Sequence, residues 1–331
     1  MKKALKIVGY IAVAIVAIAA AGILYMQYAF PNVDAAPAIT ITKAPALVER
    51  GEYLANHVAI CIDCHSERDW SKYAGPPIPG TEGKGGDRFD HSMGFPGVFY
   101  ARNISSDKET GLGNWTDGEI YRAITRGVSK DGEPLFPVMP YKAYNQMSKQ
   151  DAYAIIAYIR TLAPISNKVP APDPDFPMNL IMRTMPLKED ASGVEETALG
   201  DEVARGKYLF TIAACADCHT PQEKGAPIEG KHLAGGFEFP FPNGNIVRSA
   251  NITPDKETGI GTWSEDMFVQ RFKMYADPAM ASQKVDPNGM NTIMPWIMYA
   301  GMKEEDLRAI YKYLRTVEPN QNKVVRFTAA P

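Results

Sequence analysis

Two copies of the pentapeptide C-x-x-C-H constrain this chain more than any other feature. They are Cys61–His65 and Cys215–His219, they begin 154 residues apart, and they contain all four cysteines of the 331 residues. C-x-x-C-H is the attachment site of c-type haem, in which both thiols add across the porphyrin vinyl groups and the histidine faces the iron. A zinc ribbon or a thioredoxin-like dithiol also uses C-x-x-C, but neither needs the histidine.

The pentapeptides therefore predict two covalently bound haem c groups. This use of the thiols leaves no cysteine for a disulfide, although the chain is expected to be exported. The predicted haem-binding cysteines and iron-ligating histidines are Cys61, Cys64, His65, Cys215, Cys218 and His219.

The sequence around the pentapeptides is repeated as well. Arg50–Leu54 reads RGEYL and Arg205–Leu209 reads RGKYL, at an offset of 155 residues. The pattern that begins with Asn-Ile at Asn103 and continues through DKETG to a tryptophan recurs from Asn251, at an offset of 148. One internal duplication explains these matches, with a longer Gly/Pro-rich loop in the first copy and a compensating insertion in the second.

Each copy is long enough to be a domain, and we place the domains at 45–170 and 201–326. Residues 171–200 are rich in proline and acidic side chains, which is typical of a linker. Residues 1–30 form a separate N-terminal segment.

This N-terminal segment is predicted to reach a membrane. Lys2, Lys3 and Lys6 precede Ile7–Met26, twenty uncharged residues that would span about 30 Å as a helix. The basic flank favours a cytoplasmic N-terminus and export of the remainder. A cleaved signal peptide is the alternative, because Ala19–Ala21 offers a cleavage site. Either interpretation puts the rest of the chain outside the cytoplasm, and the first adds a single membrane anchor.

Composition excludes other classes of function. The chain has 35 basic and 38 acidic residues, a formal net charge of −3, and therefore no basic face for a nucleic acid. With 45% hydrophobic residues it cannot be wholly disordered.

Wherever a period is visible it is helical, and the fold class we expect is all-α. Ser148 with Asp151 and Thr116 with Glu119 are predicted to cap two helices, and Ser264 caps the equivalent of the second. Segments rich in Gly, Pro and Phe between the motifs are predicted to be long loops, with at most a short hairpin.

A sixth iron ligand is predicted in each copy. Met139 and Met294 are 155 residues apart and each precedes a proline. A thioether there favours reduced iron and keeps oxygen and peroxide away from it. Four other methionines compete for these positions: Met147, Met290, Met298 and Met302.

The combined pattern resembles the class I cytochrome c family in both copies. A Gly-x-Tyr helix precedes each C-x-x-C-H, a Met-Pro pair follows, and tyrosines lie in each last helix. Residues 251–263, NITPDKETGIGTW, resemble the motif of membrane-bound cytochrome c subunits of bacterial periplasmic dehydrogenases, whereas the first copy has Ser105-Ser106 in place of Thr-Pro. The resemblance covers 45–326 and implies two tandem cytochrome c domains.

The resemblance also assigns roles to individual residues. Gly51 and Gly206 would let the first and last helices of each domain cross closely. The side-chain N–H groups of two asparagines and two tryptophans could bind haem propionates, with a core or turn role as the equal alternative. These four residues are Asn103, Trp115, Asn251 and Trp263.

Other polar residues are given structural roles. Asp107 and Asp255 begin turns and lack the ligand alternation of a calcium loop. His57, His91 and His232 have no counterparts in the other copy. We expect them to be surface or structural histidines, with His91 or His232 as the remaining candidates for an alternative iron ligand.

Together these features predict a membrane-anchored dihaem electron-transfer protein rather than an enzyme. It would take single electrons from a periplasmic dehydrogenase or respiratory complex and pass them to an oxidase or another acceptor. The alternative is a dihaem cytochrome c peroxidase, which needs one iron without a sixth protein ligand.

Overall fold

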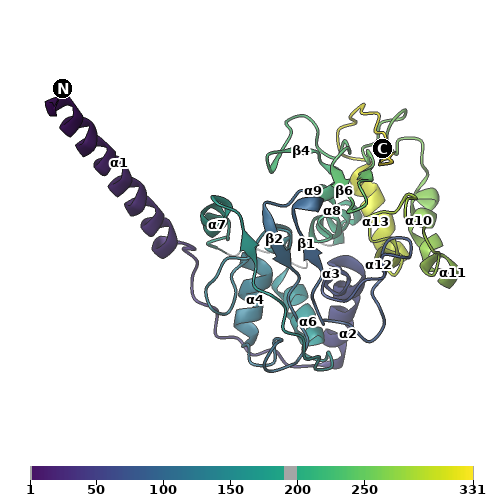
Figure 1. Ribbon diagram of the computed structural model, residues 1–331. Coiled ribbons are helices and arrows are strands. Elements are labelled where there is room, and N and C mark those ends of the chain that lie inside the picture. Colours follow the sequence, from purple (N-terminus) through teal and green to yellow (C-terminus); the bar gives the residue numbers. More distant parts are fainter. Residues whose placement is uncertain (1, 190–199, 331) are drawn as a thin grey trace.

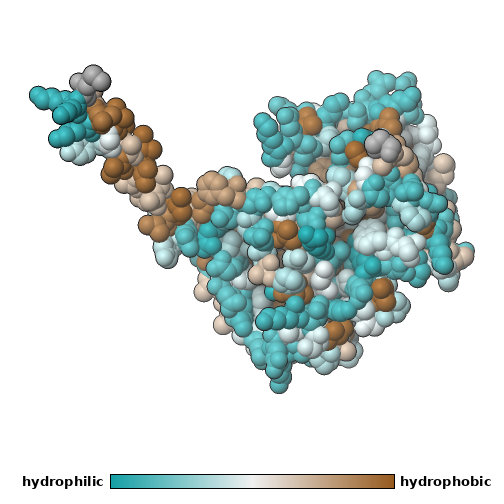
Figure 2. All heavy atoms as spheres, viewed as in Figure 1, coloured by the Kyte–Doolittle hydropathy of each residue, from teal (hydrophilic) through white to brown (hydrophobic). Residues whose placement is uncertain are grey.

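The computed structural model describes residues 2–189 and 200–330. Helix α1 (Lys2–Ala29) projects away from the rest of the molecule (Figure 1), and none of its residues is buried. It is long and apolar enough to cross a membrane, and hydrophobic residues cover most of its surface in Figure 2. The predicted long apolar helix is therefore present, and its insertion in a membrane stays a prediction. Its retention as an anchor stays a prediction.

The two sequence repeats build matching sets of helices. In the first repeat these are α2 (Pro45–Tyr53), the π-helix η1 (Leu54–Val58), α3 (Cys61–Cys64), α4 (Asp117–Arg126), α5 (Tyr141–Tyr144) and α6 (Lys149–Ile159). In the second repeat they are α8 (Glu202–Ile212), α9 (Cys215–His219), α10 (Glu265–Lys273), η5 (Met274–Ala276), α11 (Pro278–Ala281), α12 (Trp296–Tyr299) and α13 (Glu304–Leu314).

The predicted helix caps are confirmed. Thr116 and Glu119 form a reciprocal capping box at the start of α4. The Ser148 hydroxyl accepts from the Asp151 amide at 3.1 Å, and the Ser264 hydroxyl accepts from the Met267 amide at 3.1 Å. These caps satisfy backbone N–H groups that a helix leaves without partners in its first turn.

In each repeat the first long helix crosses the last one, α2 against α6 and α8 against α13. A Cβ atom on Gly51 would lie 1.8 Å from the Ala154 carbonyl oxygen, and one on Gly206 would lie 1.9 Å from that of Ala309. The expected close crossing at both glycines is thus confirmed, since no larger residue fits without separating the backbones.

The all-α expectation is only partly correct, because short antiparallel strands join the loops. Each strand has two to four residues. The three sheets are β1 (Arg88–Phe89), β2 (Gly97–Tyr100) and β3 (Asp173–Pro174); β4 (Gln222–Glu223) and β5 (Ala226–Pro227); and β6 (Glu238–Pro240), β7 (Ile246–Arg248) and β8 (Phe327–Thr328).

Part of the expected linker, 171–200, is structured. Strand β3 pairs with β2 of the first repeat, and α7 (Met178–Ile181) packs against α1. The 3₁₀ turn η3 (Met182–Thr184) follows α7, as η2 (His91–Met93) follows β1. Residues 190–199 of the linker lie outside the described residues.

The repeats pack against each other through matching elements. Helix α5 of the first repeat contacts α8 of the second, and α12 of the second contacts η1 of the first. Buried apolar residues of both repeats join in one hydrophobic cluster. The segments that carry the two pentapeptides are therefore held in one packed body (Figure 1).

Candidate functional site

Each C-x-x-C-H pentapeptide forms a short helix that starts in the same unusual way. The residue before the first cysteine is left-handed in both copies, with φ of 49° at Ile60 and 53° at Ala214. This conformation is costly for residues other than glycine. It turns the chain sharply from the preceding helix into α3 or α9. The two cysteines of each pair then lie one helical turn apart, as thioether bonds to one porphyrin require.

None of the four cysteines is paired in a disulfide. Surrounding protein raises the pKa of Cys61, Cys215 and Cys218 to about 12, and it raises the pKa of Cys64 as well. The cause is desolvation of the thiolate by the surrounding protein. Within residues 2–189 and 200–330 no three His, Cys, Asp or Glu side chains are grouped as a metal site.

Both pentapeptide histidines are oriented by a backbone carbonyl. His65 Nδ1 lies 2.6 Å from the Arg102 carbonyl oxygen, and His219 Nδ1 lies 2.8 Å from that of Ala250. A carbonyl only accepts, so Nδ1 carries the proton and Nε2 keeps a lone pair for a metal. Burial lowers the pKa of both imidazoles, that of His219 to about 4. Both are therefore neutral, as an iron ligand must be.

Two glycines that the sequence analysis missed support this histidine geometry. Gly85 and Gly235 are left-handed, each with φ of 69°. Their amides donate to the carbonyls of His65 and His219, both at 2.8 Å. A Cβ on Gly85 would lie 2.5 Å from the carbonyl of Arg102 that orients His65, and the second copy is equally tight. The sequence signal that could have identified these two positions is a Gly-Gly pair at the same place in both repeats.

The predicted methionine ligands occupy equivalent positions. Met139 and Met294 each precede a proline that starts a one-turn helix, α5 or α12. Both are half-buried and pack against the main hydrophobic cluster. Of the competing methionines, Met290 is 40% exposed, while the other three are buried in the core: Met147, Met298 and Met302. This placement supports Met139 and Met294, and their ligation stays a prediction.

The first repeat also contains a buried hydroxyl without a partner. Tyr141, two residues after Met139, is fully buried, and its hydroxyl has no hydrogen-bond partner among the described residues. An unpaired buried polar atom is costly. Thiols one turn apart, a histidine with a free Nε2, a half-buried methionine and this hydroxyl fit a haem c group. The second repeat offers the same donors, with Trp296 in place of Tyr141.

The two asparagines predicted to contact propionates are occupied by protein groups. Asn251 Nδ2 donates to the Asn320 carbonyl at 2.7 Å and to Thr258 Oγ1 at 3.0 Å. Asn103 Nδ2 makes the equivalent contacts, at 2.7 Å to Ile165 and 3.1 Å to Thr110. Both N–H groups of each amide are used, so each asparagine closes a loop here.

The two tryptophans predicted to contact haem propionates have side-chain N–H groups that are available for such a contact. Trp115 and Trp263 are half-buried, and neither indole nitrogen donates to an acceptor in the described part of the chain. A propionate contact therefore remains a prediction for these two residues.

The remaining polar residues have structural contacts. The Asp255 carboxylate accepts from the amides of Glu257 and Thr258, and Asp107 does the same in the first repeat. Both are turn residues, as expected. His57 Nδ1 lies 2.9 Å from the Met298 carbonyl of the other repeat. His91 Nε2 lies 2.8 Å from Asp175.

Removal of the Asn251 amide is expected to destabilise the protein. Asn251 is 4% exposed, and Asn251→Ala would leave several buried donors and acceptors unpaired, at a cost of about 3 kcal/mol. Denaturant unfolding measures this loss. Asn114→Ala is the control, because Asn114 is exposed and makes one hydrogen bond to the Lys108 carbonyl. Equal stabilities of the two variants would contradict the loop-closing role.

Comparison with protein families finds a match to the second repeat. Residues 203–318 match the family model described as Cytochrome c. These residues are therefore a cytochrome c domain. The matched region contains the second pentapeptide, with its oriented His219, and Met294.

Curated relatives match over both repeats of the chain. The chain is 30% identical over 286 residues to the cytochrome c subunit of alcohol dehydrogenase (quinone) from Gluconobacter oxydans, covering 82% of this chain and 55% of that protein. It is 32% identical over 291 residues to the gluconate 2-dehydrogenase cytochrome c subunit of Pantoea cypripedii, covering 82% and 60%. A diheme cytochrome c-type protein of Cereibacter sphaeroides is 29% identical over 265 residues, covering 78% and 81%. The chain thus spans little more than half the length of the first two relatives.

Proposed function

We propose that the chain is a dihaem electron-transfer subunit and that each repeat, 45–170 and 201–326, is a domain with one haem c. The observation that carries this proposal is the matched geometry of His65 and His219, each with Nδ1 on a carbonyl and Nε2 free. A duplicated site of this kind suits a protein that holds two equal cofactors. The diheme relative agrees with a count of two.

The bound haem supplies a one-electron couple, and the protein determines its environment. The four cysteines fix the porphyrins covalently. The Arg102 and Ala250 carbonyls hold the histidine rings in one tautomer. Met139 and Met294 complete the ligand sets, which favours electron transfer over reactions of small molecules at iron.

We infer a periplasmic dehydrogenase as the electron donor. Relatives are named as cytochrome subunits of alcohol and gluconate dehydrogenases and of a fructose dehydrogenase. By this analogy the chain receives electrons from a catalytic subunit and passes them to an oxidase or another acceptor. Helix α1 would hold it in the inner membrane, with both haem domains in the periplasm.

The peroxidase alternative gains no support. It needs one iron with an open position, and Met-Pro occupies the equivalent place in both repeats. The relatives named above are cytochrome subunits and a diheme cytochrome.

Haem stoichiometry tests the central proposal. Full-length protein matured in a host that attaches haem c is expected to carry one haem for each of its two pentapeptides. The double variant Cys61→Ala/Cys64→Ala should lose one haem, and Cys215→Ala/Cys218→Ala is its matched partner in the second repeat. Haem per chain is measured by pyridine haemochrome absorbance against protein mass. A wild-type protein with a single haem would contradict the proposal.

A further inference from the structure

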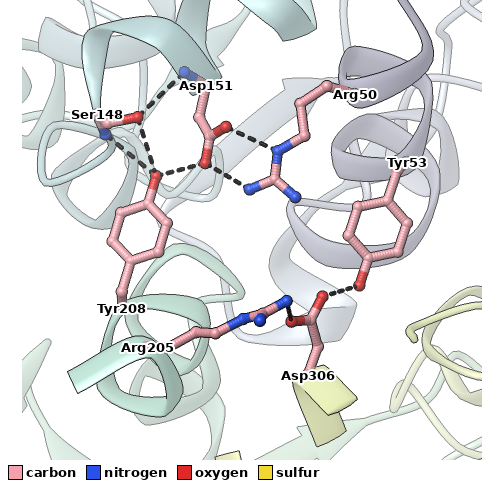
Figure 3. Close-up of polar contacts among 7 residues, drawn as sticks. All are labelled: Arg50, Tyr53, Ser148, Asp151, Arg205, Tyr208 and Asp306. Carbon is pink, nitrogen blue, oxygen red and sulfur yellow. Dashed lines mark hydrogen bonds and ion pairs between the residues drawn. The ribbon is translucent and has the colours of Figure 1, made fainter. Parts of the chain in front are cut away.

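Two hydrogen-bonded clusters join the repeats, and they are copies of each other (Figure 3). We call them the Asp151 contact and the Asp306 contact, after the carboxylate at the centre of each. The Asp151 contact consists of Arg50, Ser148, Asp151 and Tyr208, and the Asp306 contact of Arg205, Lys303, Asp306 and Tyr53. Each member has its counterpart at an offset of 155 residues.

In the Asp151 contact, a tyrosine of the second repeat binds the first. The Tyr208 hydroxyl donates to Asp151 Oδ2 at 2.7 Å and accepts from the Ser148 amide at 3.1 Å. Arg50 donates to both carboxylate oxygens of Asp151, each at 2.8 Å. Asp151 is 7% exposed, so the charge is paired away from water.

In the Asp306 contact, a tyrosine of the first repeat binds the second repeat. The Tyr53 hydroxyl, from the first repeat, donates to Asp306 Oδ2 and accepts from the Lys303 amide at 3.2 Å. Arg205 forms an ion pair with Asp306. Asp306 is fully buried.

This exchange is the pattern of a two-fold interface, formed here within one chain. Residue 53 of one repeat binds residue 306 of the other, and their counterparts 208 and 151 do the same in return. Hydrogen bonds from a hydroxyl to a buried, paired carboxylate are strong and directional. Apolar packing of α5 on α8 and α12 on η1 tolerates small rotations, whereas two oriented contacts fix one arrangement.

Both contacts attach directly to the elements that present the pentapeptides. Tyr53 ends α2, which continues through η1 to Cys61, and Tyr208 lies on α8, which leads to Cys215. Asp151 and Asp306 lie in the first turns of α6 and α13, which follow the methionine segments. A tyrosine of one site is thus fixed to the helix beyond the methionine of the other.

We propose that Tyr53 and Tyr208 are positioning residues that set the relative orientation of the two haems, and with it the transfer of electrons between them. This inference rests on the proposed function, in which each repeat holds one haem. Neither tyrosine is an iron ligand, and both act through the packing of the repeats.

The test compares Tyr53→Phe, Tyr208→Phe and the double variant with the full-length, haem-loaded wild type. Phenylalanine keeps the ring and removes the hydroxyl. Each lost bond to a charged acceptor is expected to raise the fraction of molecules in other arrangements by about ten-fold. Two readouts report the arrangement: the haem–haem couplet in the Soret circular dichroism spectrum, and the rate of electron equilibration between the haems after flash reduction.

We expect the couplet amplitude and the equilibration rate to fall in each single variant and to fall furthest in the double variant, at unchanged haem content. Tyr158→Phe is the matched control, since among the described residues the Tyr158 hydroxyl bonds only within the first repeat, where it accepts from Asn56 at 3.0 Å. Variants that keep the wild-type couplet and rate would overturn this inference alone. A wild type without two haems would overturn the proposed function. If the double variant does not fold, the single variants decide.

Discussion

Alanine at Met139 or at Met294 is expected to open one iron per chain to carbon monoxide. The wild-type protein, with a thioether on both irons, should bind none at neutral pH. Both methionines are half-buried and pack on the main core, so the shorter side chain leaves space for the ligand beside the iron. A carbon monoxide difference spectrum of the reduced protein measures the stoichiometry.

The two variants should open different sites, and the double variant should open both. Met290→Ala is the control, because Met290 is 40% exposed and its loss should leave carbon monoxide binding unchanged. Rapid stoichiometric binding by the wild type would show that an iron has no methionine ligand and would revive the peroxidase alternative. If Met298→Leu, and not Met294→Ala, allows carbon monoxide to bind, then Met298 would be the ligand of the second iron.

Gly206→Ala and Gly51→Ala are each expected to destabilise the protein by about 3 kcal/mol or more. The new methyl group would lie 1.9 Å from the Ala309 carbonyl oxygen or 1.8 Å from that of Ala154. Because these contacts are with backbone, the helices must separate along their length. Denaturant unfolding of the haem-loaded protein measures the loss.

Gly200→Ala serves as the control, since no atom of the described residues lies within 4 Å of a Cβ at that position, and its effect should stay within about 0.5 kcal/mol. A Gly206→Ala protein as stable as Gly200→Ala would mean that the two helices do not cross as described. Haem content should be measured in parallel, because a shifted α8 also displaces the turn into α9.

Features with a local cause were predictable from the sequence. The caps at Thr116, Ser148 and Ser264 follow from side chains that reach backbone amides a few residues away. The glycine crossings at Gly51 and Gly206 were also predictable, because the resemblance to class I cytochromes c implies them.

Features that depend on distant segments were not predictable. Strand β8 joins the sheet of β7 only because the fold brings residues 327–328 beside 246–247, and two-residue strands carry no periodic signal. The carbonyls of Arg102 and Ala250 that orient the histidines come from loops whose course the sequence leaves open. Asp151 was recognisable as a helix-start residue, yet its bond to Tyr208 depends on how the repeats dock.

The covalent connection between the repeats changes what their interface must achieve. Tethered partners meet at an effective concentration of about millimolar. Two separate domains with a millimolar dissociation constant, about −4 kcal/mol, would associate only weakly. Joined in one chain at a millimolar effective concentration, the same two domains would already be associated about half of the time. The Asp151 and Asp306 contacts can then act mainly by stabilising one docked arrangement of the two repeats over the others.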